Sequence, residues 1–197
     1  MAKKPENTIT KIRTGYGDKG ETFLVNPNVS KADPLVDFVG TLDEANAFTG
    51  KIKLEDIFTH NKDISIKVVN RAVIHINSSQ NLLFDIGAAV HSGKVRDSVI
   101  ENIDVYVNQT EGLINWVQTE SEKYQKLNGF IYPINLNADA MIARTVIRRA
   151  EREAVKSNCF WAVPALNIMS DFFFLVSWML SNQSPNQWTG VSTNETE

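Results

Sequence analysis

Apolar side chains recur every three to four positions through most of the chain, and Pro, Gly and short polar residues fall between these periodic segments. The pattern predicts five helices, at about Pro34 to Lys53, Ile64 to Val90, Asn102 to Leu127, Asn137 to Ser157 and Ala165 to Asn182. Asp33 and Asn137 mark two of the starts, because short polar side chains can accept hydrogen bonds from the free N–H groups of a first turn. We therefore expect an all-α protein, a five-helix bundle.

Length and composition limit what this chain can be. With 197 residues it has room for one domain, which we place at 1–183, followed by a polar, disordered tail at 184–197. A net charge of −3 argues against general nucleic-acid binding, which needs a basic surface, and the single cysteine, Cys159, fits a reducing interior. The longest apolar stretch, Phe172 to Leu180, is too short to cross a bilayer, and no secretory signal is visible. We expect a soluble cytoplasmic protein without membrane contact.

Two runs are apolar enough to form the core or a contact between subunits. They are Leu82, Leu83, Phe84 and Ile86 in the second predicted helix, and Phe172 to Val176 in the fifth. Each run has an acid beside it, Asp85 and Asp171. A buried carboxylate needs a cation or several hydrogen bonds to stay charged, so we expect both acids to have such partners. The arginines of the fourth helix are available for this.

Four arginines lie close together in the predicted fourth helix. On a helix with 3.6 residues per turn, Arg144, Arg148 and Glu151 share one face, while Arg149 and Arg152 turn partly away. Guanidinium groups at this spacing suit a polyphosphate, because each presents a planar fork of N–H donors to phosphate oxygens. The alternative is a solvated helix face with several salt bridges.

A second segment that suits phosphate lies near the N-terminus. It runs Thr14, Gly15, Tyr16, Gly17, Asp18, Lys19, Gly20, Glu21 and Thr22. Glycine tolerates positive φ and lets backbone N–H groups approach phosphate oxygens closely. The segment does not match a Walker P-loop, since no Gly-Lys-Ser/Thr run follows. The alternative is a glycine-rich turn between an N-terminal arm and the first helix.

Taken in order, these segments resemble the ATP:cob(I)alamin adenosyltransferases, specifically the trimeric five-helix-bundle family that includes the propanediol-utilisation and human mitochondrial enzymes. The matching positions are Thr14, Gly17 to Gly20 and Thr22; Ser30, Lys31, Asp33 and Pro34; Gly40 to Glu44; Leu83 to Gly87; Phe130 and Pro133; Ala143 to Thr145 and Arg148 to Arg152; and Leu166, Asn167, Ser170 and Asp171. The match spans about Thr10 to Leu180. It implies a ferritin-like up-down topology, a homotrimer, and transfer of the 5′-deoxyadenosyl group of ATP to cob(I)alamin, giving adenosylcobalamin and triphosphate.

The resemblance also implies roles for individual residues. By this comparison ATP binds to Thr14, Gly15, Gly17, Asp18, Lys19, Gly20, Thr22, Lys31 and Arg148, with Glu151 and Asn167 contributing across the subunit interface. Asp43 and Arg144 match a salt bridge between subunits that positions the corrinoid. Phe130 matches an aromatic residue that helps displace the lower axial ligand. Mg²⁺ would arrive with the phosphates of ATP rather than in a protein site. A cobalamin reductase and a B12-dependent acceptor enzyme are the implied partners.

In the implied reaction, reduced cobalt is the nucleophile and attacks the 5′ carbon of ATP, expelling triphosphate. The protein then orients the two substrates and stabilises the leaving charge, which lysine, arginine and backbone N–H groups can do. No Ser, Cys or His nucleophile is needed. His60, His75 and His91 lie outside every motif and are assigned no role.

Two departures from the family pattern concern the corrinoid side. Ile134 and Asn135 stand where the family has Gly-Gly, and Ile168 stands where it has arginine. They favour an alternative function, a non-catalytic corrinoid- or nucleotide-binding trimer for storage, delivery or sensing. A further alternative is a helical nucleotide-binding module unrelated to B12.

Overall fold

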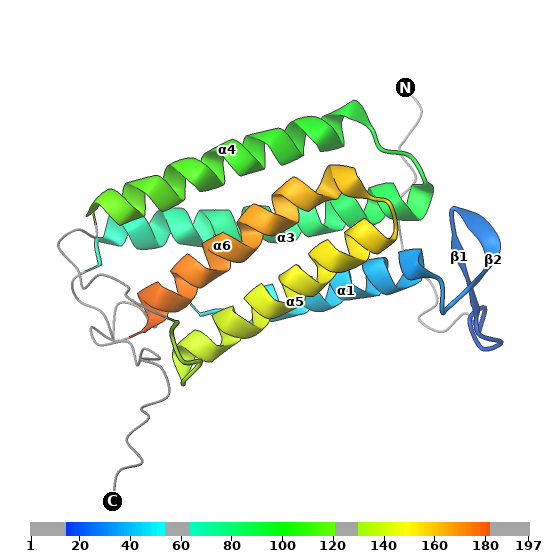
Figure 1. Cartoon of the computed structure of the whole chain (residues 1–197), viewed down its shortest axis with the longest axis horizontal. Helices are drawn as coiled ribbons and strands as arrows, with labels where there is room; N and C mark the ends of the chain where they lie inside the picture. The colour runs from blue at the N-terminus through cyan, green and yellow to red at the C-terminus, as the bar shows by residue number, and fades with distance from the viewer. Residues whose placement is uncertain (1–14, 54–63, 121–129, 182–197) are drawn as a thin grey trace, which may run out of the picture.

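The computed structural model describes residues 15–53, 64–120 and 130–181, and its long helices pack side by side (Figure 1). They are α1 (Pro34–Thr49), α3 (Ile66–Ser92), α4 (Asp97–Glu120), α5 (Leu136–Lys156) and α6 (Val163–Leu180), with a 3₁₀ turn, η2 (Phe160–Ala162), before α6. The five predicted helices are therefore confirmed in order and type. Thr14, His60, the predicted helix end at Leu127 and the predicted tail lie outside the described residues.

The helix ends follow local hydrogen bonds as well as hydrophobic periodicity. α1 begins where predicted, because the Asp33 side chain accepts a hydrogen bond of 2.9 Å from a backbone N–H of the first turn. It ends at Thr49 rather than at Lys53, since the next residue is a glycine that closes the last turn. α4 begins at Asp97 rather than at Asn102. The reason is that the backbone N–H groups of Val99 and Ile100 already donate to the Arg96 carbonyl, just before the helix.

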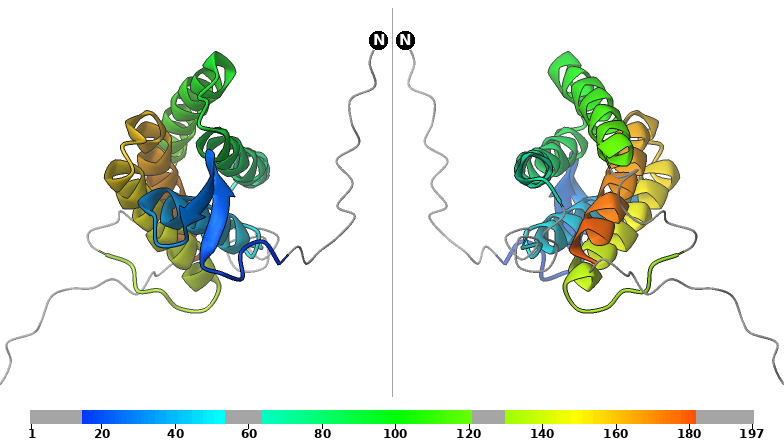
Figure 2. Two further views of the ribbon diagram at one scale, coloured as in Figure 1. Left: turned by 90° about the vertical axis from the view of Figure 1, so that its right-hand side faces the viewer. Right: turned by 90° about the vertical axis from the view of Figure 1, so that its left-hand side faces the viewer.

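A small β-hairpin precedes α1 and is a correction to the predicted all-α fold. Its antiparallel strands are β1 (Glu21–Leu24) and β2 (Asn26–Ser30), and Thr22 faces Val29 across them. Pro27 and the asparagines beside it interrupt the alternation of apolar and polar side chains that identifies a strand, so the sequence did not predict it. The hairpin lies at the end of the helices where α1 begins and α3 ends (Figures 1 and 2).

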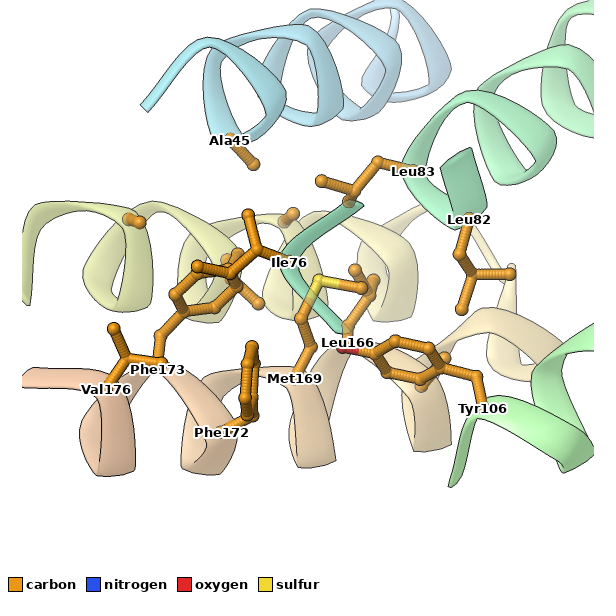
Figure 3. Close-up of a cluster of buried hydrophobic side chains, with 14 of the residues drawn as sticks. Ala45, Ile76, Leu82, Leu83, Tyr106, Leu166, Met169, Phe172, Phe173 and Val176 are labelled. Carbon is orange, nitrogen blue, oxygen red and sulfur yellow. The ribbon is translucent and has the colours of Figure 1, made fainter. Parts of the chain in front are cut away.

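The core lies between the packed faces of the helices. α1 packs on α3 and α5, α4 packs on α3 and α6, and α5 packs on α6. Met169, Phe172 and Phe173 of α6 are fully buried and lie close to Ile76 and Leu83 of α3 (Figure 3). The apolar run predicted for the fifth helix is therefore largely used inside the subunit.

The composition of α6 corrects one expectation. The segment Phe160–Leu180 is long and apolar enough to cross a membrane by length and hydropathy, although the sequence pattern indicated no such stretch. In its most apolar window, 56% is buried inside the protein, as is typical of the core helix of a globular domain.

The two acids of the apolar runs are not buried, which corrects another expectation. Asp171 is exposed, and Asp85 is half-buried and accepts a hydrogen bond of 3.3 Å from the Asn102 side chain. Phe84 is 64% exposed, so part of its run faces outward. Consecutive helical residues point about 100° apart, and an unbroken apolar run therefore cannot bury every member in one core.

A buried polar network joins α3 to α4 inside the core. The His75 ring nitrogen Nε2 lies 2.6 Å from the Thr110 hydroxyl, and the ring stacks on Tyr106 with centroids 4.6 Å apart. The Thr110 hydroxyl donates its proton to the Tyr106 carbonyl, so it must accept from His75 Nε2–H. Tyr106 in turn bonds Ser79 at 2.6 Å. His75 thus has a structural role in linking the two helices.

We expect this histidine to make the fold acid-sensitive. Burial lowers the pKa of His75 from 6.5 to about 4, so the unfolded chain binds the extra proton at a higher pH than the folded one. The unfolding free energy should therefore fall as pH drops from about 6.5 toward 4, by roughly 2 kcal/mol at pH 5 relative to pH 7.5. The unfolding free energy of His75→Gln, measured by urea unfolding, should fall less over the same pH range. His91→Gln, at an exposed histidine, should keep the wild-type dependence, and equal slopes for all three proteins would contradict the assignment.

Candidate active site

The glycine-rich loop sits at the open end of the hairpin, immediately before β1. Its backbone forms two successive turns, in which Asp18 N–H donates to the Gly15 carbonyl and Gly20 N–H donates to the Gly17 carbonyl, each at 3.3 Å. Gly15 and Gly20 have φ of 73° and 82°, which side chains with a Cβ adopt at a cost. The loop is exposed apart from the half-buried Gly17. Gly15 and Gly20 are therefore required by the backbone path of the loop.

Lys31 closes over this loop from the end of β2. Its backbone N–H donates to the Gly20 carbonyl at 2.9 Å. A Cβ added to Gly17 would lie 2.8 Å from Lys31 Nζ, so the ammonium group rests against the bare loop backbone. The fold thus brings together Lys31 and the predicted loop residues that it describes, which include Thr22, half-buried on β1. An ammonium group beside a largely exposed glycine-rich loop suits an anionic ligand.

The arginine face of α5 is the second cluster. Arg148 is exposed, and Arg144 and Glu151 are half-buried on the same face of the helix. Arg149 was predicted to turn away, and the structure shows that it forms an ion pair with Glu44 of α1. No sequence pattern indicated this pair, because the register of two helices depends on tertiary packing.

Arg144 lacks a hydrogen-bonding partner for a buried nitrogen. Its Nε is buried and unpaired within the part of the chain that the structure describes, and its guanidinium carbon lies 5.4 Å from the centre of the Phe174 ring. Burial lowers the pKa of Arg144, repulsion from Arg148 lowers it further, and attraction to Asp171 opposes both. A half-buried cation with an unpaired N–H needs an acceptor that this chain does not provide in the described region.

Asp43 does not supply that acceptor within the same chain. It is exposed on α1, and the ion pairs among the described residues do not join it to Arg144. The pairs Lys51–Asp139 and Glu44–Arg149 show that α1 and α5 run antiparallel. Asp43 therefore lies level with the α5 segment just after Arg149, about 9 Å along the axis from Arg144.

Lys31 and Arg148 are also separated within one chain. Arg148 lies at the level of Glu44, and ten residues of α1 separate Pro34 from Glu44, a rise of about 15 Å. Lys31 lies beyond Pro34. One subunit therefore places its two phosphate-compatible clusters at different heights along the helices.

The remaining predicted residues lie on the surface or at an end of the helices. Phe130 is 70% exposed, and Asn167 is exposed near the start of α6. Asn135 precedes α5 with φ of 53°, a conformation that suits the family glycine better than asparagine. Among the described residues no group of three or more His, Cys, Asp or Glu side chains could hold a metal.

The segment after Phe130 is held by Asn137, although not as a helix cap. The Asn137 side chain accepts from Ile134 N–H at 2.7 Å, and donates to the Tyr132 carbonyl at 3.2 Å and to the Ser181 hydroxyl at 2.8 Å. The predicted capping role is thus corrected, since Asn135 occupies the cap position without a side-chain bond. Asn137 instead ties the segment to the end of α6.

Comparison with known proteins decides the family. The model of the family described as cobalamin adenosyltransferase matches residues 12–180, which is most of the chain. This chain belongs to the cobalamin adenosyltransferase family. The resemblance drawn from the motifs is confirmed, and with it the enzyme class. The roles of the individual site residues remain predictions.

Similar proteins support this assignment along nearly the whole chain. This adenosyltransferase is 32% identical over 194 residues to the corrinoid adenosyltransferase of Mycobacterium leprae (strain TN), with 91% of this chain and 96% of the relative covered. It is 29% identical over 187 residues to that of Bacillus subtilis (strain 168), with 88% of each chain covered.

Solved structures show the same fold. An arginine-to-lysine variant of the PduO-type ATP:corrinoid adenosyltransferase from Lactobacillus reuteri, complexed with ATP, has a TM-score of 0.60 at 26% identity, covering 84% of this chain and 91% of that chain. A phenylalanine-to-alanine variant of the same type from that organism, complexed with cobalamin and ATP, has a TM-score of 0.62 at 24% identity, covering 91% and 100%.

Proposed function

We propose that this adenosyltransferase moves the 5′-deoxyadenosyl group of ATP to the cobalt of cob(I)alamin, releasing triphosphate. The family match over residues 12–180 carries the proposal. The two Lactobacillus reuteri structures support it, because those proteins are complexed with ATP, or with cobalamin and ATP. The seating of Lys31 over the glycine loop adds a physical reason, since it provides a cationic site of the kind that binds phosphates.

The residues of the two cationic clusters suit this chemistry. The reduced cobalt supplies the electron pair for the new bond to the 5′ carbon, and the bond from that carbon to the triphosphate oxygen breaks. Triphosphate leaves with additional negative charge, which Lys31, Arg148 and backbone N–H groups of the loop would stabilise. The protein contributes no nucleophile, and Cys159 is buried with a raised thiol pKa. Mg²⁺ would be held mainly by the phosphates, with Asp18 or Glu151 as a single protein contact, as Mg²⁺ commonly is.

We further propose that the site is completed by a second copy of the chain in a homotrimer. Three observations support this: the separation of Lys31 from Arg148, the unpaired Nε of Arg144 and the exposure of Asp43. A closed ring would bring the loop of one subunit to the arginine helix of the next and pair Asp43 with Arg144 across the interface. Phe130 would face the corrinoid there.

The apolar surface available for assembly belongs to α3 rather than to α6. Ile66, Ile74 and Phe84 on α3 are each more than 60% exposed. The apolar excess of α6, which the sequence left open as core or as a contact between subunits, is largely buried inside the subunit. Exposed aliphatic and aromatic side chains along one helix are typical of an oligomer contact.

One assay tests the proposed reaction. Under anaerobic conditions, the protein is mixed with cob(I)alamin and MgATP, and absorbance is followed for formation of the cobalt–carbon bond while triphosphate is quantified. We expect one triphosphate for each adenosylcobalamin formed, and neither product when ATP is left out. Binding of both substrates without product would instead support the non-catalytic trimer. Binding of ATP without corrinoid would support the unrelated nucleotide-binding module.

A further inference from the structure

The tip of the hairpin is attached to the C-terminal end of α3. Val25, between the two strands, donates its backbone N–H to the His91 carbonyl at 2.9 Å. The Phe23 ring lies 5.9 Å from the His91 ring. This end of α3 closes at Gly93, which has a φ of 63°. The hairpin therefore rests on the last turn of a long core helix.

The contact between Val25 and Gly93 is unusually close. A Cβ added to Gly93 would lie 2.7 Å from Val25 Cγ1, which real Cβ atoms essentially never show, and 3.1 Å from Cγ2. Val25 itself has φ of 59°, a region in which a β-branched residue is a true outlier. Such a conformation persists only where the surroundings hold it in place. The strained valine thus occupies a space that the absence of a side chain on Gly93 leaves open.

The other end of the hairpin carries the cationic loop. Glu21 pairs with Ser30 at the open end of the ladder, and the next residue, Lys31, bonds the Gly20 carbonyl. Two short paired strands therefore connect the Val25 tip directly to the loop and to Lys31. A shift of the tip would be passed to both, because a paired hairpin moves as one unit.

We propose that Val25 and Gly93 are positioning residues, which seat the hairpin on α3 and so hold Lys31 and the glycine loop in place for the ATP triphosphate. This inference rests on the proposed function. Neither Val25 nor Gly93 is proposed to contact substrate, and both act through the position of the hairpin. We expect a disturbed contact to change the KM for ATP and not the KM for cob(I)alamin, because the corrinoid-side residues lie outside the hairpin. These residues are Phe130, Asp43 and Arg144.

The test uses Gly93→Ala in the full chain. We expect the KM for ATP to rise about tenfold, equivalent to about 1.4 kcal/mol, while kcat at saturating ATP and the KM for cob(I)alamin stay within about twofold. Gly112→Ala is the matched control, because a Cβ there would meet nothing within 4 Å. It should leave all three constants unchanged.

A double variant distinguishes the effect of the close contact with Val25 from the effect of positive φ at residue 93. In the double variant Val25→Ala/Gly93→Ala, the nearest remaining contact is the Cβ of residue 25 at 3.5 Å, an ordinary van der Waals distance. The double variant should recover the wild-type KM for ATP, although alanine keeps the unfavourable positive φ at residue 93. A wild-type KM in Gly93→Ala, or no recovery in the double variant, overturns the inference.

Two further results keep the inference separate from the proposed reaction. If the wild type forms no adenosylcobalamin, the proposed function fails. Calorimetric measurement of ATP binding by the same variants then tests the contact between Val25 and Gly93 directly, and we expect the Kd for ATP to rise about tenfold in Gly93→Ala. If Gly93→Ala does not fold, Val25→Gly loosens the seat from the other side and leaves the α3 end intact. We expect it to raise the KM or Kd for ATP about threefold, and an unchanged value overturns the inference.

Discussion

Replacing Asp43 by asparagine will slow adenosylation at least about tenfold, a barrier change near 1.4 kcal/mol, while the affinity for ATP changes much less. The reason is the environment of Arg144, whose Nε is buried and unpaired in the described part of one chain. If Asp43 of a neighbouring copy supplies the missing acceptor, its loss leaves a desolvated charge at a cost of about 3–5 kcal/mol. The corrinoid would then be misplaced relative to the 5′ carbon.

Charge exchange provides the decisive comparison. Asp43→Arg and Arg144→Asp should each disturb assembly, and the double variant should recover it better than either single change. Sedimentation will follow this, since the wild type should have about three times the 22.1 kDa mass of one chain. Glu44→Gln is the matched control, because Glu44 lies on the same helix as Asp43 and forms an exposed ion pair with Arg149 of α5. Loss of that pair should lower the free energy of unfolding by less than about 1 kcal/mol. Full activity in Asp43→Asn, or a double variant no better than the singles, would show that the pair has no role.

Lys31→Ala and Arg148→Ala will each weaken ATP binding by about 10- to 150-fold, or about 1.5–3 kcal/mol, without unfolding the chain. Each removes a charge-assisted contact with the triphosphate. Both side chains are exposed and neither belongs to the core, so stability should be kept. Lys51→Ala is the control, because it removes an exposed lysine whose partner is Asp139. Calorimetry with MgATP measures the effect, and wild-type affinity in both variants would exclude these residues from the site.

Mixing the two variants tests where the site lies. If Lys31 of one subunit and Arg148 of the next form one site, a mixed trimer regains about one intact site in three. Chains refolded together should then show activity that neither variant shows alone. If both residues serve the same site from one chain, every site carries a defect and mixing restores nothing.

Several features of this protein followed from local sequence. Helical periodicity placed all five helices, and the start of α1 at Asp33-Pro34 was confirmed because a cap depends only on neighbouring residues. The hairpin was missed, since its strands are short, contain Pro27 and are stabilised by contact with α3 rather than by their own alternation. Asn137 was assigned to a cap because its partner, Ser181, lies far away in sequence.

The sequence by itself determined the helices, the family and the residue types that a phosphate site needs, because periodicity, motif order and side-chain chemistry are all local properties of a chain. Only the tertiary structure decided which of these residues meet. It placed Lys31 against Gly17, paired Arg149 with Glu44 and left Nε of Arg144 unpaired within the described chain. These outcomes depend on the register between elements, which packing of the whole core fixes.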